Sequence, residues 1–218
     1  GMALAAEEAP LAKLEEKNTR QNVERGLDAL SNELDKMNRT ARDWAAWDDT
    51  YAFIEDSNPA YIEGNLMDAT LINLRLNLMI FVHSSGRIVF GKAVDLEQEK
   101  EIPVPRSVLD HLSTNDLLLQ HPDTKSSITG IILLPEGSLL IASRPILTSQ
   151  DEGPMRGTLI MGHYLDPAEI EHLDEVTHLS LAVRRFDDPQ IPFDFQVARS
   201  SLSKEVAPIF VQALSAES

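Results

Sequence analysis

The 218-residue sequence contains no cysteine, which excludes disulfides, thiolate nucleophiles and thiolate metal sites. It also lacks any apolar run of about 18 residues, the length that a membrane-spanning helix requires. The best candidate, Leu76 to Val82, is far too short. Basic residues are few, since 19 Lys and Arg stand against 35 Asp and Glu for a formal charge of −16, and they form no run. We therefore predict no nucleic-acid partner, because phosphate binding needs clustered Lys and Arg.

The remaining composition is that of a globular protein. Hydrophobic residues make up 43% of the chain and charged residues 25%, so a chain of this length can bury a substantial core. A glycine precedes Met2, and no basic start with an apolar stretch follows it. We read the chain as a piece of a longer protein.

A long amphipathic helix is predicted from Pro10 to about Phe53, a stretch with a single glycine and no further proline. Steps of three and four separate its apolar positions, which are Val23, Leu27, Leu30, Leu34, Met37, Ala41, Trp44 and Tyr51, with Asp48 completing the register. Such spacing is typical of an a/d seam, and forty helical residues reach about 60 Å. Before Val23 the stripe is weaker, so we expect this part to project or to form a homodimer with another copy.

Shorter helices and a β-hairpin are predicted next. Asn58 can cap a helix that begins at Pro59, Gly64 favours a break, and Asn65 can cap a further helix to about Leu76. Residues 77–95 then change to a period of two around the turn 84–86, which predicts a hairpin. Residues 106–122 are expected to be helical.

Further strands are predicted at 130–135, 139–147, 157–165 and 178–186, with a short helix capped by Asp166 before the last of them. Short turns between neighbouring strands favour an antiparallel sheet. The fold class is therefore α+β, with the long helix packed on the sheet and smaller helices flanking it. Residues 187–218 hold three prolines and little periodicity, so we expect them to be loosely attached or incomplete.

The segment DWAAWDDTYAFI, residues 43–54, contains both tryptophans of the chain and is the densest aromatic and acidic cluster. Asp48 and Asp49 could act as acid and base beside an indole ring, but consecutive helical residues point about 100° apart, so the two carboxylates do not converge. In a structural interpretation, one face of the helix packs on the sheet, and Asp48 accepts hydrogen bonds from backbone amides of a neighbouring loop. That face comprises Trp44, Trp47, Asp48 and Tyr51.

Other chemistry receives little support. The histidines form no helical i, i+4 pair; they are His83, His111, His121, His163, His172 and His178. We find neither a phosphate loop nor a nucleophile elbow, and so we predict no catalytic residue, no metal ligand and no cofactor. Arg144 in SRPI could clamp a carboxylate ligand at a strand end, or it could simply face solvent.

Several motifs in the same order give the chain a resemblance to a known family. They are the W-x-x-W-D-D helix, the NL helix after residue 64, the hairpin around SSGRIV, the AS-x-PI strand and the GP-x-x-G turn before the final strands. Together they cover about residues 30 to 173, and they resemble the fourth type of CHASE domain. These domains are extracellular sensory modules of prokaryotic histidine kinases and diguanylate cyclases.

The resemblance implies a PAS-like or Cache-like sensory domain at residues 30–186. Residues 1–29 would be a helix leading from a membrane span, and 187–218 a C-terminal segment before a second span and an output domain. The whole protein would be membrane-anchored, with this portion periplasmic or extracellular and binding an unknown small molecule. The family pattern falls on Trp44, Trp47, Asp48, Asp49 and Tyr51, to which we add His83 and Arg144 as candidate ligand-binding residues. The alternatives are a small hydrolase that uses Asp48 or Asp49 with His83 or His163, and a dimerisation module without a ligand.

Overall fold

The computed structural model describes residues 2–110, 112–113, 116–175 and 210–213. The chain divides into two compact units, residues 1–33 with 166–206 and residues 34–165 with 207–218. Helical segments are α1 (Met2–Ala45), α2 (Asp48–Asp56), α3 (Pro59–Asn65), α4 (Asp68–Leu74), α5 (Arg106–Leu109) and the 3-10 turn η1 (Leu117–Leu119). No helix within the described residues is both long and apolar enough to cross a membrane.

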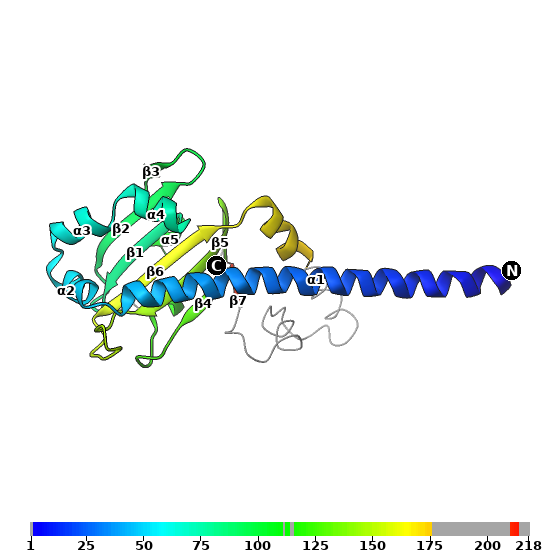
Figure 1. The fold of residues 1–218 in the computed structure, drawn as a ribbon, viewed down its shortest axis with the longest axis horizontal. Coiled ribbons are helices and arrows are strands. Elements are labelled where there is room, and N and C mark those ends of the chain that lie inside the picture. The colour runs from blue at the N-terminus through cyan, green and yellow to red at the C-terminus, as the bar shows by residue number, and fades with distance from the viewer. Residues whose placement is uncertain (1, 111, 114–115, 176–209, 214–218) are drawn as a thin grey trace. The chain divides into compact units, whose positions relative to one another are not determined.

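The second unit is built on one seven-stranded sheet of order β3-β2-β1-β6-β5-β4-β7. Its strands are β1 (Leu78–His83), β2 (Ile88–Asp95), β3 (Lys100–Ile102), β4 (Ile128–Leu134), β5 (Gly137–Pro145), β6 (Gly157–Tyr164) and β7 (Phe210–Ala213). Strands β1 to β6 pair antiparallel, whereas β7 joins β4 in parallel. Figure 1 shows the last turns of α1 lying across this sheet, with α2 and α3 beside β1 and β2. The predicted α+β class, with a long helix on an antiparallel sheet and flanking helices, is confirmed.

The predicted hairpin is also confirmed, and its turn residues explain it. Strands β1 and β2 pair from Leu78 with Ala93 to Val82 with Ile88. Between them Gly86 has a φ of 92°, a conformation that a residue with a side chain rarely adopts. The register shifts between Phe81 and Val82, where a bulge increases the local twist.

The long helix ends earlier than the sequence predicts. Helix α1 stops at Ala45, and Trp47 has extended backbone angles of φ −144° and ψ 130° before α2 begins. The predicted face shared by Trp44, Trp47, Asp48 and Tyr51 is therefore wrong, because the helix breaks between the two tryptophans. The seam itself is correct from Val23 to Ala41, since its members there are 0–7% exposed, whereas Trp44 is half-buried.

Two smaller predictions need correction. Asn65 is the last residue of α3 rather than a cap, and α4 begins after Met67. Residues 106–122 are not one helix, because α5 and η1 are the helical segments among the residues described there. Within the C-terminal segment, the described residues 210–213 form β7, which pairs with β4. The expectation that residues 187–218 are loosely attached or incomplete stays a prediction. The strand predicted at 178–186 lies outside the described residues.

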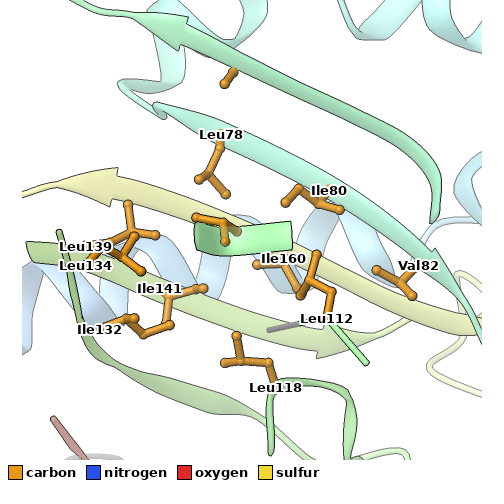
Figure 2. Close-up of a cluster of buried hydrophobic side chains, with 12 residues drawn as sticks. Leu78, Ile80, Val82, Leu112, Leu118, Ile132, Leu134, Leu139, Ile141 and Ile160 are labelled. Atoms are coloured by element: carbon orange, nitrogen blue, oxygen red, sulfur yellow. The ribbon is translucent and has the colours of Figure 1, made fainter. Parts of the chain in front are cut away.

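The sheet has two differently covered faces. One face, shown in Figure 2, carries aliphatic side chains from β1, β4, β5 and β6 that pack against Val108, Leu112 and Leu118. These three residues come from the segment between β3 and β4, whose described residues include the single-turn helices α5 and η1. The opposite face holds Phe81 and packs against aromatic residues of α2 and α3. Burial on both faces fixes the register, since a slip by one residue would reverse every side chain.

In the first unit, α1 approaches the helical residues 167–175 closely at Gly26. A Cβ atom placed on Gly26 would lie 3.1 Å from Cβ of His172, so the glycine permits this packing. Asp166 caps the second helix as predicted, because its carboxylate accepts from the Glu169 amide at 2.7 Å. Glu169 accepts in return from the Asp166 amide at 3.1 Å, which completes a capping box.

Candidate functional site: a clasp between helix and loop

The DWAAWDDTY segment lies against the β5–β6 loop. We call residues 42–51 together with the loop residues 146–156 the clasp. Its centre is a backbone link, since the Leu147 amide donates to the Ala45 carbonyl at 3.0 Å. Ala46 forms a parallel bridge with Leu147. The end of α1 is thus bonded to the continuation of a sheet strand, which explains why the helix stops at Ala45.

Asp48 and Ser149 reinforce this link with two reciprocal hydrogen bonds. The Asp48 amide donates to Ser149 Oγ at 2.8 Å, and the Ser149 amide donates to Asp48 Oδ1 at 2.9 Å. The carboxylate also lies in the first turn of α2, where the helix dipole favours negative charge. Asp48 therefore accepts a hydrogen bond from a backbone amide of a neighbouring loop, as the structural interpretation predicts. It is exposed, however, and not packed on the sheet as that interpretation also required.

Tyr51 and Arg156 hold the far end of the loop. The Tyr51 hydroxyl donates to the Pro154 carbonyl at 2.7 Å, and Arg156 donates to the Tyr51 carbonyl at 2.9 Å. The guanidinium carbon of Arg156 lies 3.8 Å from the centre of the Tyr51 ring, a cation–π geometry. Two of the motifs that carry the family resemblance, the WDD segment and the GP-x-x-G turn, are therefore bound to each other.

A cluster of aromatic side chains packs against the tryptophans of the clasp. Trp44 and Trp47 meet edge to face with centroids 6.3 Å apart, and Trp47 lies 5.7 Å from Tyr61. Tyr61 stacks on Phe53 at 4.3 Å, and its hydroxyl pairs with Thr50 at 2.6 Å. Burial raises the pKa of Tyr61 to about 12, so the hydroxyl stays protonated. Both tryptophans are half-buried, and they connect the break in the helix to the core.

The other predicted site residues are distributed around this centre. Asp49 is exposed on α2. His83 accepts from the Ser85 amide at Nδ1, at 3.0 Å, and donates from Nε2 to Glu55 at 3.1 Å. Both its ring nitrogens are thus engaged by residues other than Asp48 and Asp49, which is unlike the acid–histidine pair of the hydrolase alternative.

Arg144 is the penultimate residue of β5. It is half-buried, and burial lowers the pKa of Arg144, with the nearby Arg42 lowering it further and Asp151 opposing both. Arg42 forms an ion pair with Asp151 at 2.8 Å. The structure therefore brings the predicted Arg144 next to the clasp that contains Trp44, although the two are a hundred positions apart in the sequence.

A second polar cluster lies on the aliphatic face of the sheet, around Ser143 of β5. Ser143 is fully buried, and its hydroxyl is 2.5 Å from the Leu118 carbonyl and 2.9 Å from His121 Nε2. Because a carbonyl only accepts, the hydroxyl donates to Leu118 and accepts the Nε2 proton of His121. Nδ1 of the neutral ring then accepts from Ser126 at 2.8 Å. His121 thereby joins η1, the following loop and β5.

We expect this histidine to make the free energy of unfolding depend on pH. Burial, with a smaller effect of Arg144, lowers the pKa of His121 from 6.5 to about 4. Between these values the unfolded chain binds a proton that the folded chain does not, so we expect stability to fall as pH decreases from 6.5 to 4, by about 3 kcal/mol at most. Urea unfolding of the wild type and of His121→Gln at pH 7 and 4.5 measures the loss of stability in each protein. The carboxylates titrate in both, so the difference between the two losses is the contribution of His121. Equal losses in both proteins would contradict it.

Within the described residues, no group of three or more His, Asp or Glu side chains is arranged to hold a metal ion. Sequence reasoning missed the partners that complete the clasp, namely Ser149, Pro154 and Arg156. The signal for two of them was the GP-x-x-G turn, which we had interpreted as a family motif and not as a loop that binds the WDD segment. The His121–Ser143 pair carried no local signal, because its members lie 22 positions apart.

Comparison with known proteins identifies the family. The model of the CHASE4 domain matches residues 29–184. The methanogenesis regulatory histidine kinase FilI of Methanothrix harundinacea (strain 6Ac) is 36% identical over 171 residues, which cover 78% of this chain but 19% of FilI. The chain thus spans about a fifth of the length of this curated relative.

Two solved structures are similar to the chain at TM-scores below 0.5. One is the extracellular domain of a protein described as a histidine kinase, vpHK1S-Z8, with a TM-score of 0.49 and 12% identity over 72% of this chain and 65% of that one. The other is a domain of a sensory box/GGDEF family protein from Vibrio parahaemolyticus, with a TM-score of 0.48 and 15% identity over 77% and 64%.

The match over most of the chain defines the class of protein, a sensory domain of the kind that signalling proteins carry as an input module. The chain belongs to the CHASE4 domain family, as the motifs indicated.

Proposed function

We propose that the chain is the extracytoplasmic, ligand-sensing input domain of a transmembrane histidine kinase or diguanylate cyclase. The CHASE4 match carries this proposal, and the 36% identical relative is a histidine kinase. The fragment itself performs no reaction in this scheme. A small molecule outside the membrane shifts the population of two arrangements, and the output domain responds.

The clasp supports a route for the signal. It bonds the end of α1 to the β5–β6 loop through Ala45, Asp48 and Tyr51. A change in the sheet or its loops therefore displaces the C-terminal end of α1, and a helix transmits such a displacement along its axis because its backbone bonds are internal. Helix α1 thus transmits the displacement from the ligand site to the membrane.

The assembly that we propose is a homodimer through α1. Its apolar seam from Val23 to Ala45 is already buried by the chain's own residues, so a partner copy contacts the part before Val23. Leu14, in that part, is 54% exposed.

The output of the full-length protein in membrane vesicles tests the proposal. We expect Asp48→Ala combined with Tyr51→Phe to weaken or abolish the response to stimulus while the domain stays folded, because both side chains bond the loop from the surface. Asp49→Ala is the matched control, since Asp49 lies in the same turn and is exposed. An unchanged response in the double variant, with a folded domain, would argue against transmission through the clasp.

A further inference from the structure

Strand β1, strand β6 and helix α2 approach one another closely where β1 ends. His83, the last residue of β1, pairs with Gly157, the first residue of β6. A Cβ atom on Gly157 would lie 3.1 Å from the His83 Cα and 3.1 Å from Cγ1 of Ile54 in α2, so the glycine permits this approach. The next amide after His83, that of Ser84, donates to the Arg156 carbonyl at 2.9 Å. The β1–β2 turn is thus bonded to the clasp.

Glu55 of α2 lies at this junction, between a histidine and an arginine. Its Oε1 atom is 3.1 Å from Nε2 of His83 and 4.0 Å from Nε of Arg156. The same guanidinium donates to the Tyr51 carbonyl and covers the Tyr51 ring. The His83 side chain is 19% exposed and that of Glu55 is 48% exposed, so the imidazole is the more enclosed partner. One carboxylate therefore joins the end of β1 to the clasp.

The hydrogen bonds of His83 determine the protonation state that this arrangement requires. The Ser85 amide lies 3.0 Å from Nδ1 and can only donate, so Nδ1 carries no proton. Nε2 then carries the proton of a neutral ring and donates to Glu55. The Ser85 hydroxyl lies 2.9 Å from Nδ1 and donates or accepts according to the state of the ring. The observed bonds are those of a neutral histidine, the side chain whose charge ordinarily changes between about pH 5 and 8.

Uptake of a proton at Nδ1 of His83 changes both sets of contacts. The Ser85 amide loses its acceptor, so the turn that carries the bond from Ser84 to Arg156 rearranges. The charged ring also competes with Arg156 for the same oxygen of Glu55. Protonation therefore weakens the attachment of the turn to the clasp.

The charged groups near His83 come from three segments of the chain. Helix α2 contributes Glu55, and Arg156 lies directly before β6. The β1–β2 turn contributes Arg87, which is exposed and whose carbonyl accepts from the His83 amide at 2.8 Å. A positive charge on His83 therefore adds to those of two arginines around the Glu55 carboxylate.

We propose that His83 is a proton-responsive joint through which the pH outside the membrane regulates the input domain. This regulation acts on the clasp and rests on the sensor function proposed above. In the neutral state, His83 holds the β1–β2 turn, α2 and the clasp together. In the protonated state the turn and the clasp are less firmly attached, so a ligand-induced change in the sheet reaches α1 less efficiently. The response to stimulus therefore falls as the pH decreases from about 8 to 5.

The tryptophan fluorescence of the 218-residue domain, recorded between pH 8 and 5, tests the joint. Trp44 and Trp47 both lie in the clasp, so their emission reports its state. We expect the emission to change with the uptake of one proton, and the amide NMR signals of Ser84 and Ser85 to shift over the same pH range. Burial lowers the pKa of His121 to about 4, which keeps that histidine outside the range.

Variants at His83 and Glu55 distinguish the joint from a merely structural contact. His83→Asn keeps an acceptor for the Ser85 amide but takes up no proton, so the emission should become independent of pH in this range. Glu55→Gln removes the carboxylate that favours the charged ring, so the transition should move to lower pH by up to about 1 unit. His163→Gln is the matched control and should leave the transition unchanged. His163 Nδ1 lies 3.0 Å from the Arg75 carbonyl and therefore donates, a bond that both charge states of the ring retain.

The full-length protein in membrane vesicles provides the functional measurement. The stimulus is kept at saturation, and the pH is changed only on the side of the input domain. The output of the wild type should fall several-fold between pH 7.5 and 5.5, whereas the output of His83→Asn should change by less than twofold.

Three results would overturn the joint. They are an emission that stays constant between pH 8 and 5, a transition that is the same in His83→Asn and the wild type, and an equal loss of output in both proteins. If His83→Asn does not fold, an unchanged transition in Glu55→Gln, a variant at an exposed residue, contradicts the joint instead. Each result leaves the sensor function standing, because that function is tested by the response of the full-length protein to its stimulus at constant pH.

Discussion

Gly157→Ala is expected to destabilise the domain by at least about 3 kcal/mol, because overpacking against backbone cannot be relieved by a rotamer change. A Cβ atom on Gly157 would lie 2.2 Å from the Val82 carbonyl oxygen and 3.1 Å from the His83 Cα. Strands β1 and β6 pair at this point, His83 with Gly157, so they would have to separate. Urea unfolding followed by circular dichroism measures the loss.

Gly64→Ala is the matched control. Gly64 lies within α3 with nothing within 4 Å of its Cβ position. Alanine is the better helix former, so we expect a gain of up to about 1 kcal/mol. If Gly157→Ala were as stable as the wild type, the close approach of β6 to β1 next to the clasp would be incorrect.

Phe53→Ala should have a comparable effect, a loss of about 3–5 kcal/mol. Phe53 is 1% exposed and lies at the centre of the aromatic cluster. Its ring stacks on Tyr61 at 4.3 Å and meets Phe81 and Phe90 edge to face at 5.4 and 6.4 Å. Removing the ring leaves a cavity between α2 and the sheet. Tyr61, which packs against Trp47, also loses the ring on which it stacks.

The control for Phe53→Ala is a truncation on the surface. Ile88 is 40% exposed, so Ile88→Ala should change the free energy of unfolding by less than about 1 kcal/mol. The same urea experiment serves for both. A small loss in Phe53→Ala would mean that α2 does not pack on the sheet through this ring.

The regular parts of the fold could be predicted because their signals are local. The steps of three and four from Val23 to Ala41 correspond to buried helix positions, and Ser84, Ser85 and Gly86 do form the hairpin turn. Asn58 caps α3 with a 2.8 Å bond from the Ala60 amide, directly before Pro59. Each of these patterns depends on neighbours within a few positions, so one sequence contains the information.

The end of α1 could not be predicted in that way. Nothing local forbids a helix through Trp47, and the apolar spacing continues to Tyr51. The break occurs because Leu147 and Ser149, about a hundred residues later, bond to Ala45 and Asp48. The same tertiary contacts give the acidic and aromatic cluster its role in the structure, which is to bind the β5–β6 loop. The sequence does not contain these contacts, so the cluster could be interpreted as a ligand site.

The segment 106–122 failed as a predicted helix for a related reason. Val108, Leu112 and Leu118 all face the aliphatic side of the sheet. A continuous helix would place positions 112 and 118 about 40° and 280° from position 108, so Leu112 and Leu118 would point about 120° apart. Burial of all three therefore favours two short turns over one helix.

Insertion of alanines into α1 of the full-length protein tests most directly whether the helix carries the signal. A series of variants carries one to seven alanines inserted after Asn18, an exposed residue. The stimulus-dependent output of each variant is compared with that of the wild type. Each insertion rotates the preceding helix by about 100°, and seven restore its phase to within about 20°. The account predicts a response that varies with the helical period and returns at seven, and a response indifferent to the number inserted would contradict it.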